Sequence, residues 1–371
     1  MTKALPPASP PTVEDVFYAY YDCRKTKRNS WSALRFEENL EQNLMDLYYD
    51  LADQTWEPSR LSCFVALYPK PREIWASEFR DRVVQYVFYN RWSQFFTSRF
   101  IYDTYACIPG RGALFGRNRV SRMMRQVSLN FTQPASVLKA DIANFFVSID
   151  KVILETMLLE HIKSPWDTWL LHKLLGYDVR DNVLIKSPKK LFKLIPKHKS
   201  LFYAKKEKGL PIGNLTSQFF ANIYLNKLDQ YAKRTLGVRY YGRYVDDIVL
   251  MHPDPSVLGS FYCALNEFCN KNLLLTFHPQ KTYLNKIEYG VDFLGYIIKP
   301  YSCYIRNRVM SHIISRLEDT QFHKNSNVVS SVNSYLGMLK HVNGYQARRK
   351  LCTRCRWLGY KHDKKFTKLV A

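Results

Sequence analysis

The sequence predicts an α+β fold built from two or three packed subdomains. Apolar residues recur at helical spacing near the N-terminus, while short apolar runs with hairpin signals gather between residues 135 and 298. The region after about residue 300 is again helical, and it is basic. At 371 residues the chain also exceeds the size at which one hydrophobic core usually stops growing, so more than one subdomain is expected.

The first third of the chain is expected to begin with helices and to continue with an extended segment. From Val13 to Ala52, apolar residues recur every three or four positions with acidic residues between them, which is typical of an amphipathic helical layer. Residues 61–76 alternate in polarity around the break at Pro69-Lys-Pro-Arg72, so we expect extended chain there. A second helical stretch is predicted from Asp81 onward.

The middle of the chain is expected to form strands with carboxylates at their ends. The apolar run 135–142 predicts a strand, and the helix expected over 151–162 has Asp150 as its N-cap. Two further apolar strands, 238–244 and 248–251, are separated only by Val-Asp-Asp. This is the pattern of a tight β-hairpin with carboxylates at its tip.

The segments around these strands differ in composition. Residues 163–208 contain eleven lysines and only four acidic residues, so we expect an exposed connection with little core of its own. A turn-rich loop from Gly209 to Gly213 opens a helix expected over 216–234. The remaining expected elements are a helix over 256–271, a strand over 273–278 and a hairpin over 292–298.

The charge of the chain predicts a polyanionic partner. Lys and Arg number 55 against 32 Asp and Glu, which gives a net charge of +23 and an isoelectric point near 9.6. A membrane surface, an acidic protein or a nucleic acid would each match this charge. The 26 Tyr, 22 Phe and 7 Trp favour nucleic acid, because rings stack on bases while Lys and Arg neutralise phosphates. The alternative is a protein that merely stays dispersed by its charge.

The sequence gives no sign of a membrane partner. It has no run of about 18 uncharged apolar residues, and its N-terminus lacks the apolar region of a secretory signal, so we expect a cytoplasmic protein. In a reducing compartment its eight cysteines are expected to be thiols. Cys352 and Cys355 have the spacing of half a zinc site, but no second pair of this kind exists, which favours two thiols.

Three aspartates have the setting that two-metal chemistry requires. Phosphodiester formation uses two divalent ions roughly 3.5 to 4 Å apart, one to activate the attacking hydroxyl and one to hold the departing pyrophosphate. Because Mg²⁺ keeps waters and substrate phosphates as ligands, two or three protein carboxylates suffice if rigid elements hold them. Asp246 and Asp247 at a hairpin tip, beside a strand ending near Asp141, meet this requirement. Taken alone, an Asp-Asp pair would equally suit a solvated turn.

Five segments follow one another in a characteristic order. They are Lys139-Ala-Asp-Ile-Ala-Asn-Phe-Phe146, Gly209-Leu-Pro-Ile-Gly-Asn-Leu-Thr-Ser-Gln218, Tyr244-Val-Asp-Asp247, Lys281-Thr282 and Phe293-Leu-Gly-Tyr296. This series resembles motifs A to E of the reverse transcriptases. The resemblance implies a right-hand polymerase that copies an RNA template into DNA from dNTPs, using a DNA or RNA primer and two Mg²⁺ ions, with Mn²⁺ as an alternative. The implied domains are an N-terminal helical extension (1–60), fingers (61–135), a palm with an antiparallel sheet (136–298) and a finger-like insertion (about 163–208), and a helical basic thumb (299–371).

The resemblance implies a role for several residues near the carboxylates. Asp141, Asp246 and Asp247 are the implied catalytic metal ligands, with the backbone carbonyl of Ile142 as an extra ligand. Lys281 matches a lysine proposed to protonate the leaving pyrophosphate, and a plain surface lysine is the alternative.

Other residues are implied to contact the sugar and the primer. Phe146 matches the side chain that excludes a ribose 2′-hydroxyl, and an ordinary core phenylalanine is its alternative. A hairpin that grips the primer is implied for Phe293, Leu294, Gly295 and Tyr296.

A basic segment near residue 70 looks like the region of this family that closes over the nucleotide. Arg72 is the best candidate for gripping the triphosphate, because a planar bidentate cation suits phosphate geometry. Lys70, Arg80 and Arg82 are further candidates, and surface charge or an ion pair with Asp81 is the alternative for each.

The second motif suggests a subtype. Ile212, Gly213 and Gln218 stand where most reverse transcriptases have Gln, Gly and Pro, and this pattern looks most like bacterial diversity-generating retroelements. An aliphatic side chain cannot make the polar contact that Gln would make near the nucleotide, so copying is expected to be error-prone. Val245, where Met is common, and the long lysine-rich stretch leave room for a related antiviral-defence enzyme. That enzyme would work with a structured non-coding RNA, and an accessory protein would supply further steps.

Two alternatives from other classes remain. A non-enzymatic RNA-binding protein would have the same charge and rings, and an RNA-templated RNA polymerase would share the palm and the two-metal chemistry. Activity of an Asp246→Asn variant separates the first from a reverse transcriptase, and the choice between dNTPs and rNTPs separates the second.

Overall fold

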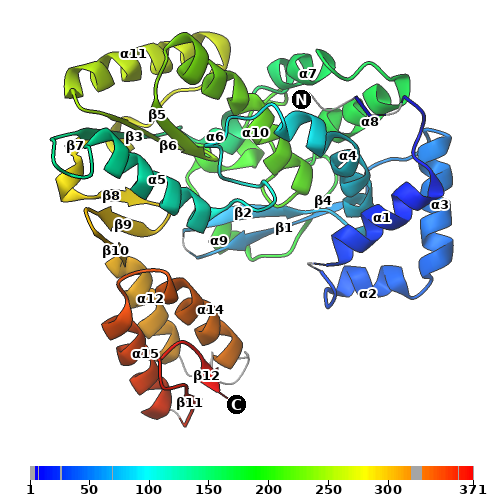
Figure 1. Ribbon diagram of the computed structural model, residues 1–371. Helices are drawn as coiled ribbons and strands as arrows, with labels where there is room; N and C mark the ends of the chain where they lie inside the picture. The colour runs from blue at the N-terminus through cyan, green and yellow to red at the C-terminus, as the bar shows by residue number, and fades with distance from the viewer. Residues whose placement is uncertain are drawn as a thin grey trace.

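The computed structural model describes residues 5–370 except Pro7, Thr26, Pro69, 319–327 and Leu358. Helices and small sheets alternate along the chain, in agreement with the α+β prediction. Figure 1 shows the N-terminal helices at one end of the molecule, the largest sheet toward the other end, and the C-terminal helices as a separate cluster below that sheet. In the described part of the chain, no helix is long and apolar enough to cross a membrane.

The predicted N-terminal helical layer is present as three helices that rest on a fourth. They are α1 (Val13–Arg24), α2 (Trp31–Glu37) and α3 (Leu40–Ala52), and α1 and α2 pack on α4 (Phe79–Thr97). A capping box between Thr12 and Asp15 begins α1, because each side chain satisfies a backbone amide of the first turn. The buried leucines of α3 carry its apolar face into the core, as the helical spacing predicted.

The predicted extended segment is a hairpin in a small sheet of order β2-β1-β4. Strand β1 (Leu61–Ala66) pairs antiparallel with β2 (Arg72–Ala76) and parallel with β4 (Val183–Ile185). The parallel strand comes from the lysine-rich stretch, about 120 residues later. This stretch is therefore joined to the fold by backbone hydrogen bonds.

The expectation of little core in 163–208 is wrong. Its first part forms α8 (Pro165–Gly176), whose Trp166, Leu170 and Leu171 are buried in the main core. The rest forms β4, α9 (Lys189–Phe192) and two 3-10 turns, η1 (Lys197–Lys199) and η2 (Leu201–Tyr203), over a small apolar cluster. Counting charges missed this because a few well-placed apolar residues suffice to anchor a lysine-rich surface.

A four-stranded antiparallel sheet of order β5-β6-β3-β7 holds the carboxylates. Its strands are β3 (Ser136–Asp141), β5 (Tyr240–Tyr244), β6 (Asp247–His252) and β7 (Tyr283–Lys286). The side chains of Leu138 and Leu250 belong to the cluster on one face, and those of Val137 and Val249 to the cluster on the other. The sheet is thus buried on both sides.

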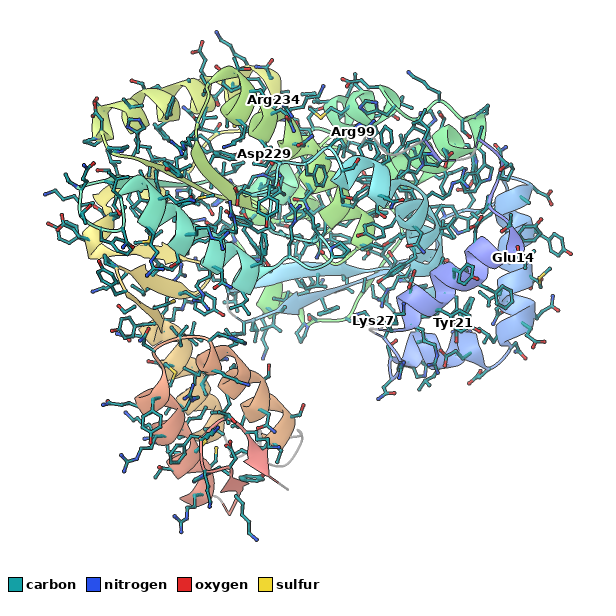
Figure 2. The ribbon with its side chains drawn as sticks, viewed as in Figure 1. Glu14, Tyr21, Lys27, Arg99, Asp229 and Arg234 are labelled. Atoms are coloured by element: carbon teal, nitrogen blue, oxygen red, sulfur yellow. The ribbon has the colours of Figure 1, made fainter. Side chains whose placement is uncertain are left out.

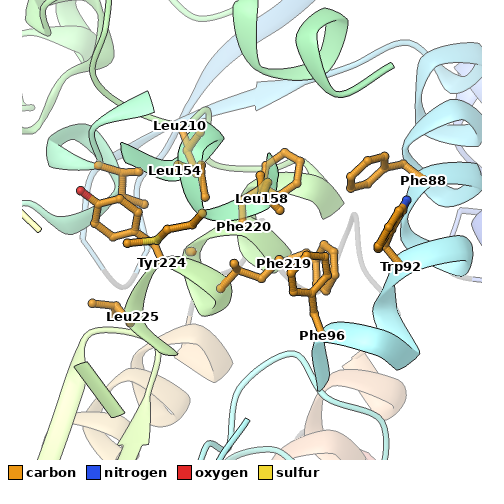
Figure 3. Packing of buried hydrophobic residues seen from close by; sticks show 14 of the residues in the cluster. Phe88, Trp92, Phe96, Leu154, Leu158, Leu210, Phe219, Phe220, Tyr224 and Leu225 are labelled. Carbon is orange, nitrogen blue, oxygen red and sulfur yellow. The ribbon is translucent and has the colours of Figure 1, made fainter. Parts of the chain in front are cut away.

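Helices cover the two faces of this sheet. One face packs against α11 (Pro255–Asn272) and, through the same core, α10 (Leu215–Gln230), while α5 (Ala113–Val127) packs on the other. Figure 3 shows Phe88, Trp92 and Phe96 of α4 facing Phe219 and Phe220 of α10, with ring centroids of Phe88 and Phe220 5.6 Å apart. A π-helical turn, Tyr231–Thr235, ends α10.

Two short helices follow β3, namely α6 (Phe145–Ser148) and α7 (Lys151–Leu159). Asp150 caps α7 as predicted, because its Oδ1 accepts hydrogen bonds from the amides of Val152 (3.0 Å) and Ile153 (3.1 Å). The predicted strand over 273–278 is wrong, since this segment makes only one isolated bridge, from Phe277 to Ile142. The neighbour of β3 on that edge is β7, preceded by a 3-10 turn at Pro279–Lys281.

The C-terminal region begins with a second small sheet. The predicted hairpin is β8 (Val291–Phe293) and β9 (Tyr296–Lys299), preceded by a 3-10 turn at Ile287–Tyr289, and the sheet continues to β10 (Ser302–Ile305). The helical region expected from about 300 therefore starts only at Asn307. Its elements are α12 (Asn307–Glu318), α14 (Val328–Lys340), α15 (Tyr345–Trp357) and the paired strands β11 (Lys361–His362) and β12 (Leu369–Val370).

Cys352 and Cys355 lie on α15 and are fully buried. Burial raises the pKa of each thiol to about 11. At neutral pH both side chains are therefore protonated thiols that pack as small apolar groups.

Candidate active site

Asp141 and Asp247 face each other across two paired strands. The register of β3 and β6 places these two residues opposite one another. Asp246 belongs to the two-residue turn that joins β5 to β6, as the sequence predicted. The amide of Ile142 donates to the carbonyl oxygen of Asp246 (3.3 Å), which ties the end of β3 to the turn. Backbone pairing thus brings together three residues that lie up to 106 positions apart in the chain.

The turn itself has an unusual backbone. Val245 has a φ of +53°, a conformation that β-branched residues rarely adopt because of steric clashes. The guanidinium of Arg243 donates a hydrogen bond to the carbonyl oxygen of Val245 (2.9 Å) and so stabilises the turn. Such strain persists where the surrounding structure fixes it, and it is common at functional sites.

The carboxylates of this cluster carry more negative charge than their surroundings balance. Burial, followed by repulsion from Asp141 and Asp247, raises the pKa of Asp246 to about 7. Burial also raises the pKa of Asp247, while Lys139 lowers it. Like charges that share a buried site disfavour ionisation, so the cluster is electrostatically prepared for a cation.

Two lysines partly balance these carboxylates. Lys281 pairs with Asp141, and the Nζ of Lys139 lies 3.3 Å from Oδ1 of Asp247. Within the described residues, no group of three or more His, Cys, Asp or Glu side chains is arranged to hold a metal ion. The chemistry of the donors nevertheless fits a hard divalent cation, which prefers carboxylate oxygens, because Asp141 and Asp247 lie close enough to Asp246 to raise its pKa.

A fully buried ion pair supports the turn. The guanidinium of Arg243 donates through Nε and Nη2 to the two carboxylate oxygens of Asp229 (2.8 and 2.7 Å), and neither side chain is exposed. The hydroxyls of Tyr241 (2.7 Å) and Thr104 (3.0 Å) donate to the same carboxylate. Figure 2 labels Asp229 near the end of α10, next to the four-stranded sheet. No sequence motif indicated this pair, although an arginine inside a predicted apolar strand was a possible signal.

One of the predicted nucleotide-binding cations, Lys70, lies in a group of positive charges. Burial lowers the pKa of Lys70, and repulsion from Lys281, Arg308, Lys199 and Arg72 lowers it further. Each of these four cations is therefore within electrostatic range of Lys70, and one of them, Lys281, pairs with Asp141. This cationic group matches the chemistry of a triphosphate.

The other two predicted cations lie elsewhere. Arg80 pairs with Asp50 of the N-terminal layer and lies 3.7 Å from Asp81, so its charge is already engaged by two carboxylates. Arg82 lines a shallow cavity together with Gly213 and Gln218. The structure thus separates the four predicted cations into three places.

The loop before α10 is fixed against β2. The amide of Trp75 donates to the carbonyl oxygen of Ile212 (2.7 Å). Gly213 has a φ of +128°, and a Cβ there would lie 2.7 Å from the carbonyl oxygen of Trp75, so only glycine fits this close approach. Gln218 is exposed and accepts a hydrogen bond from the thiol of Cys107 (3.2 Å). The backbone of Ile212 is therefore fixed by its hydrogen bond to β2.

The two phenylalanines of α6 differ in exposure. Phe145 is buried in the main core, whereas Phe146 is half-buried at its margin. The carbonyl oxygen of Phe146 accepts a hydrogen bond from the amide of Leu210 (2.8 Å), which places Phe146 beside the loop before α10. Of the pair, Phe146 is the side chain that is available to a ligand.

The predicted primer-grip residues form the turn between β8 and β9. Leu294 and Gly295 both have positive φ, as the central residues of a tight hairpin turn require. Phe293 is fully buried against Tyr105, with ring centroids 6.3 Å apart, and the guanidinium of Arg117 lies 5.7 Å from the ring of Tyr296. Phe293 and Tyr296 therefore anchor the hairpin on α5 and on the segment before it, and the half-buried Leu294 and Gly295 form its tip.

Comparison with known families matches most of this region. The model of the family described as "Reverse transcriptase (RNA-dependent DNA polymerase)" matches residues 69–298. The match includes all three aspartates, both pairing lysines and the loop before α10. No curated protein matches the chain significantly.

Proposed function

Since the chain belongs to the reverse transcriptase (RNA-dependent DNA polymerase) family, we propose that it makes DNA on an RNA template at Asp141, Asp246 and Asp247. The observation that carries this proposal is the pairing of Asp141 with Asp247 beside the Asp246 turn, where loss of solvent contact and then repulsion from the other two carboxylates raise the pKa of Asp246. Cations that balance such a cluster stabilise its ionised form. The right-hand arrangement of fingers (61–135), palm (136–298) and thumb (299–371), after a helical extension (1–60), is part of the same proposal.

The three aspartates, with the backbone carbonyl of Ile142, would hold two Mg²⁺ or Mn²⁺ ions. When bound, such ions lower the pKa of the attacking 3′-hydroxyl and neutralise the departing pyrophosphate. Lys281, which pairs with Asp141, would donate a proton to the leaving group once it is released from that carboxylate. Lys70, which Lys281 and Arg72 both repel, would hold the triphosphate together with Arg72.

Three further parts of the site would select and position the substrates. Phe146, half-buried beside the loop before α10, would exclude a ribose 2′-hydroxyl. Arg82, Gly213 and Gln218, which line one cavity, would form the edge of the nucleotide site. The hairpin tip at Leu294 and Gly295 would contact the primer.

We assign the biological role to a diversity-generating retroelement that copies a structured RNA with low fidelity. Ile212 supports this assignment, because its side chain offers no hydrogen bond with which to check the incoming nucleotide. An antiviral-defence enzyme that works with a non-coding RNA is the second candidate, and Val245 next to the aspartates favours it. An accessory protein would take part in either setting.

Primer extension tests the polymerase. We expect wild-type protein to extend a DNA primer on an RNA template with dNTPs, and Asp246→Asn to lose at least about a thousandfold in rate, since a metal ligand acts directly on the reacting groups. Binding of the primed RNA should be retained. Extension by Asp246→Asn at the wild-type rate would refute the assignment of the site, and a non-enzymatic RNA-binding protein would then be the better interpretation.

Two further measurements test selectivity. Phe146→Ala should raise rNTP incorporation relative to dNTP incorporation. Phe145→Leu, which replaces the buried neighbour of Phe146, should not. Ready use of rNTPs by the wild type would contradict a DNA product.

Misincorporation opposite each template base tests low fidelity. An error rate at adenine equal to that at the other bases would count against a diversity-generating role.

A further inference from the structure

The lysine-rich segment forms a defined lobe, residues 177–208, which we call the lysine lobe. Its small core joins Phe202 to Trp75 of β2 and to Phe192 of α9, with ring centroids 4.7 and 5.9 Å apart. The buried carboxylate of Glu73 accepts a hydrogen bond from the amide of Leu201 (2.9 Å). These contacts hold the surface of the lobe in a fixed arrangement on the β2-β1-β4 sheet.

The charge of this surface is almost entirely positive. Between residues 186 and 208 there are nine lysines and one acidic residue, Glu207. The lysines are Lys186, Lys189, Lys190, Lys193, Lys197, Lys199, Lys205, Lys206 and Lys208, and all but the last are exposed. Across the described residues, none of the nine forms an ion pair within the chain, whereas Lys25, Lys227 and Lys271 elsewhere each pair with a carboxylate. The lobe therefore repels itself unless an external anion balances it.

Apolar groups are interleaved with the lysines. Tyr203 is 65% exposed, and the Nζ of Lys197 lies 5.5 Å from its ring centroid. Leu194 is also exposed. An exposed ring beside cations is the combination that binds unpaired bases, because the ring stacks while the ammonium groups neutralise phosphates. An acidic protein or a lipid headgroup would be attracted by the lysines, but neither would stack on the exposed ring of Tyr203.

The lobe adjoins the strand that carries two of the predicted nucleotide-binding cations at or near its start. The amide of Leu201 donates to Glu73 of β2, and Lys199 lies near enough to Lys70 to repel it, while Lys186 directly follows the edge strand β4. The positive charge of the lobe therefore extends along the small sheet toward Lys70.

We propose that the lysine lobe is a second RNA-binding surface, which holds an unpaired segment of the RNA beyond the stretch being copied. The proposal rests on the proposed function, since it assumes an RNA template. Its role is to retain the RNA while the template moves through the catalytic site.

A charge-matched pair of variants tests this surface. The lobe variant carries Lys186→Gln, Lys189→Gln, Lys190→Gln and Lys193→Gln, and the control carries Lys25→Gln, Lys163→Gln, Lys227→Gln and Lys271→Gln, all at exposed positions. Binding is measured by titrating a labelled RNA hairpin with single-stranded flanks at several salt concentrations. Primer extension is measured in parallel on a short primed RNA that is too small to reach the lobe.

We expect the lobe variant to bind the flanked hairpin at least about tenfold more weakly, and its log–log salt slope to fall by roughly 3, at about 0.7 per lost phosphate contact. The control variant should bind much more tightly than the lobe variant, and both should extend the short substrate at the wild-type rate. Tyr203→Ala should weaken binding by roughly tenfold while Tyr203→Phe does not, since stacking requires only the ring.

Three outcomes separate the proposals. Equal loss of affinity in the lobe and control variants would show a general charge effect and would overturn the lysine-lobe proposal. Wild-type affinity in the lobe variant would also overturn it and would leave the surface to another polyanion, such as an acidic protein. Failure of wild-type protein to extend the short primed RNA would instead overturn the proposed function.

Discussion

The fold treats two carboxylates in opposite ways, namely that of Asp229, fully buried near the end of α10, and that of Asp246, half-buried in the turn after β5. Asp229 receives both arms of the Arg243 guanidinium and two hydroxyl groups, so its charge is balanced within the chain. Asp246 lies beside two more carboxylates, and burial together with their repulsion raises its pKa to about 7. A balanced buried charge contributes to the structure, whereas an unbalanced one persists because it serves a ligand.

The largest expected difference concerns stability after removal of each carboxylate. Asp229→Ala should lower the free energy of unfolding by about 3–5 kcal/mol, because it leaves the Arg243 charge buried and unpaired. Asp246→Ala should not destabilise the protein at pH values above its raised pKa. A carboxyl group whose pKa is raised by folding stabilises the protein at low pH, and this contribution is lost as the pH rises through the raised pKa. Above that pH Asp246 is ionised, so its removal relieves repulsion from Asp141 and Asp247. Urea unfolding of both variants measures the two effects.

The comparison would fail if the two variants lost the same stability. In that case the negative charge of the carboxylate cluster would be as well balanced as that of Asp229. The inference that the cluster is suited to bind a cation would then be wrong. Arg243→Lys is a useful control, because it keeps a positive charge near Asp229 but loses the fork that also reaches the carbonyl oxygen of Val245.

Asp81 is an intermediate case and predicts a pH effect. It is almost fully buried and accepts hydrogen bonds from the amide (2.8 Å) and hydroxyl (3.1 Å) of Ser59, yet burial raises its pKa to about 6. The stability it contributes is therefore present below its unfolded pKa and is lost as the pH rises through 6. Asp81→Asn should abolish this dependence, and the two proteins should diverge by roughly 3 kcal/mol between about pH 4 and pH 7.

Thermal and urea unfolding at several pH values checks this prediction. Glu14→Gln is the control, since it removes an acidic side chain in the first turn of α1. The pH dependence of its stability should equal that of the wild type. Parallel curves for wild type and Asp81→Asn would mean that the buried carboxyl ionises without cost, through its contacts with Ser59 and Arg80.

The parts of the structure that follow local patterns were predictable. The hairpin with Asp246 and Asp247 at its tip, the strand ending at Asp141 and the Asp150 cap all depend on a few neighbouring residues. The Arg243–Asp229 pair was missed, because its members are 14 residues apart and neither belongs to a motif. The pairing of β4 with β1 is likewise a long-range contact that no local pattern encodes.

The separation of the predicted cations shows the same limit. Residue type and proximity in sequence group Arg80 with Arg82, but α4 turns them toward different partners, Asp50 for the first and the cavity at Gly213 and Gln218 for the second. A helix turns by about 100° per residue, so side chains two positions apart, such as those of Arg80 and Arg82, point in nearly opposite directions.

The smallest expected effect on stability concerns Lys281, the lysine that pairs with Asp141 of the carboxylate cluster. Lys281 is 44% exposed while it pairs with Asp141, so Lys281→Gln should change the free energy of unfolding by less than about 1 kcal/mol. It should nevertheless bind Mg²⁺ or Mn²⁺ severalfold more tightly, because the ammonium group no longer competes with the cation for Asp141. Calorimetric titration of the metal without nucleotide, at a pH above 7, measures this affinity.

A matched control for this last change is Lys286→Gln, since Lys286 is exposed and lies 3.7 Å from Glu288, away from the aspartates. It should alter neither stability nor metal affinity. Tighter metal binding in Lys281→Gln together with slower primer extension would give Lys281 two roles, as the counter-ion of Asp141 before the reaction and as a proton donor during it. Weaker metal binding would contradict the first role, because it would mean that Lys281 holds Asp141 in place for the cation instead of competing with it.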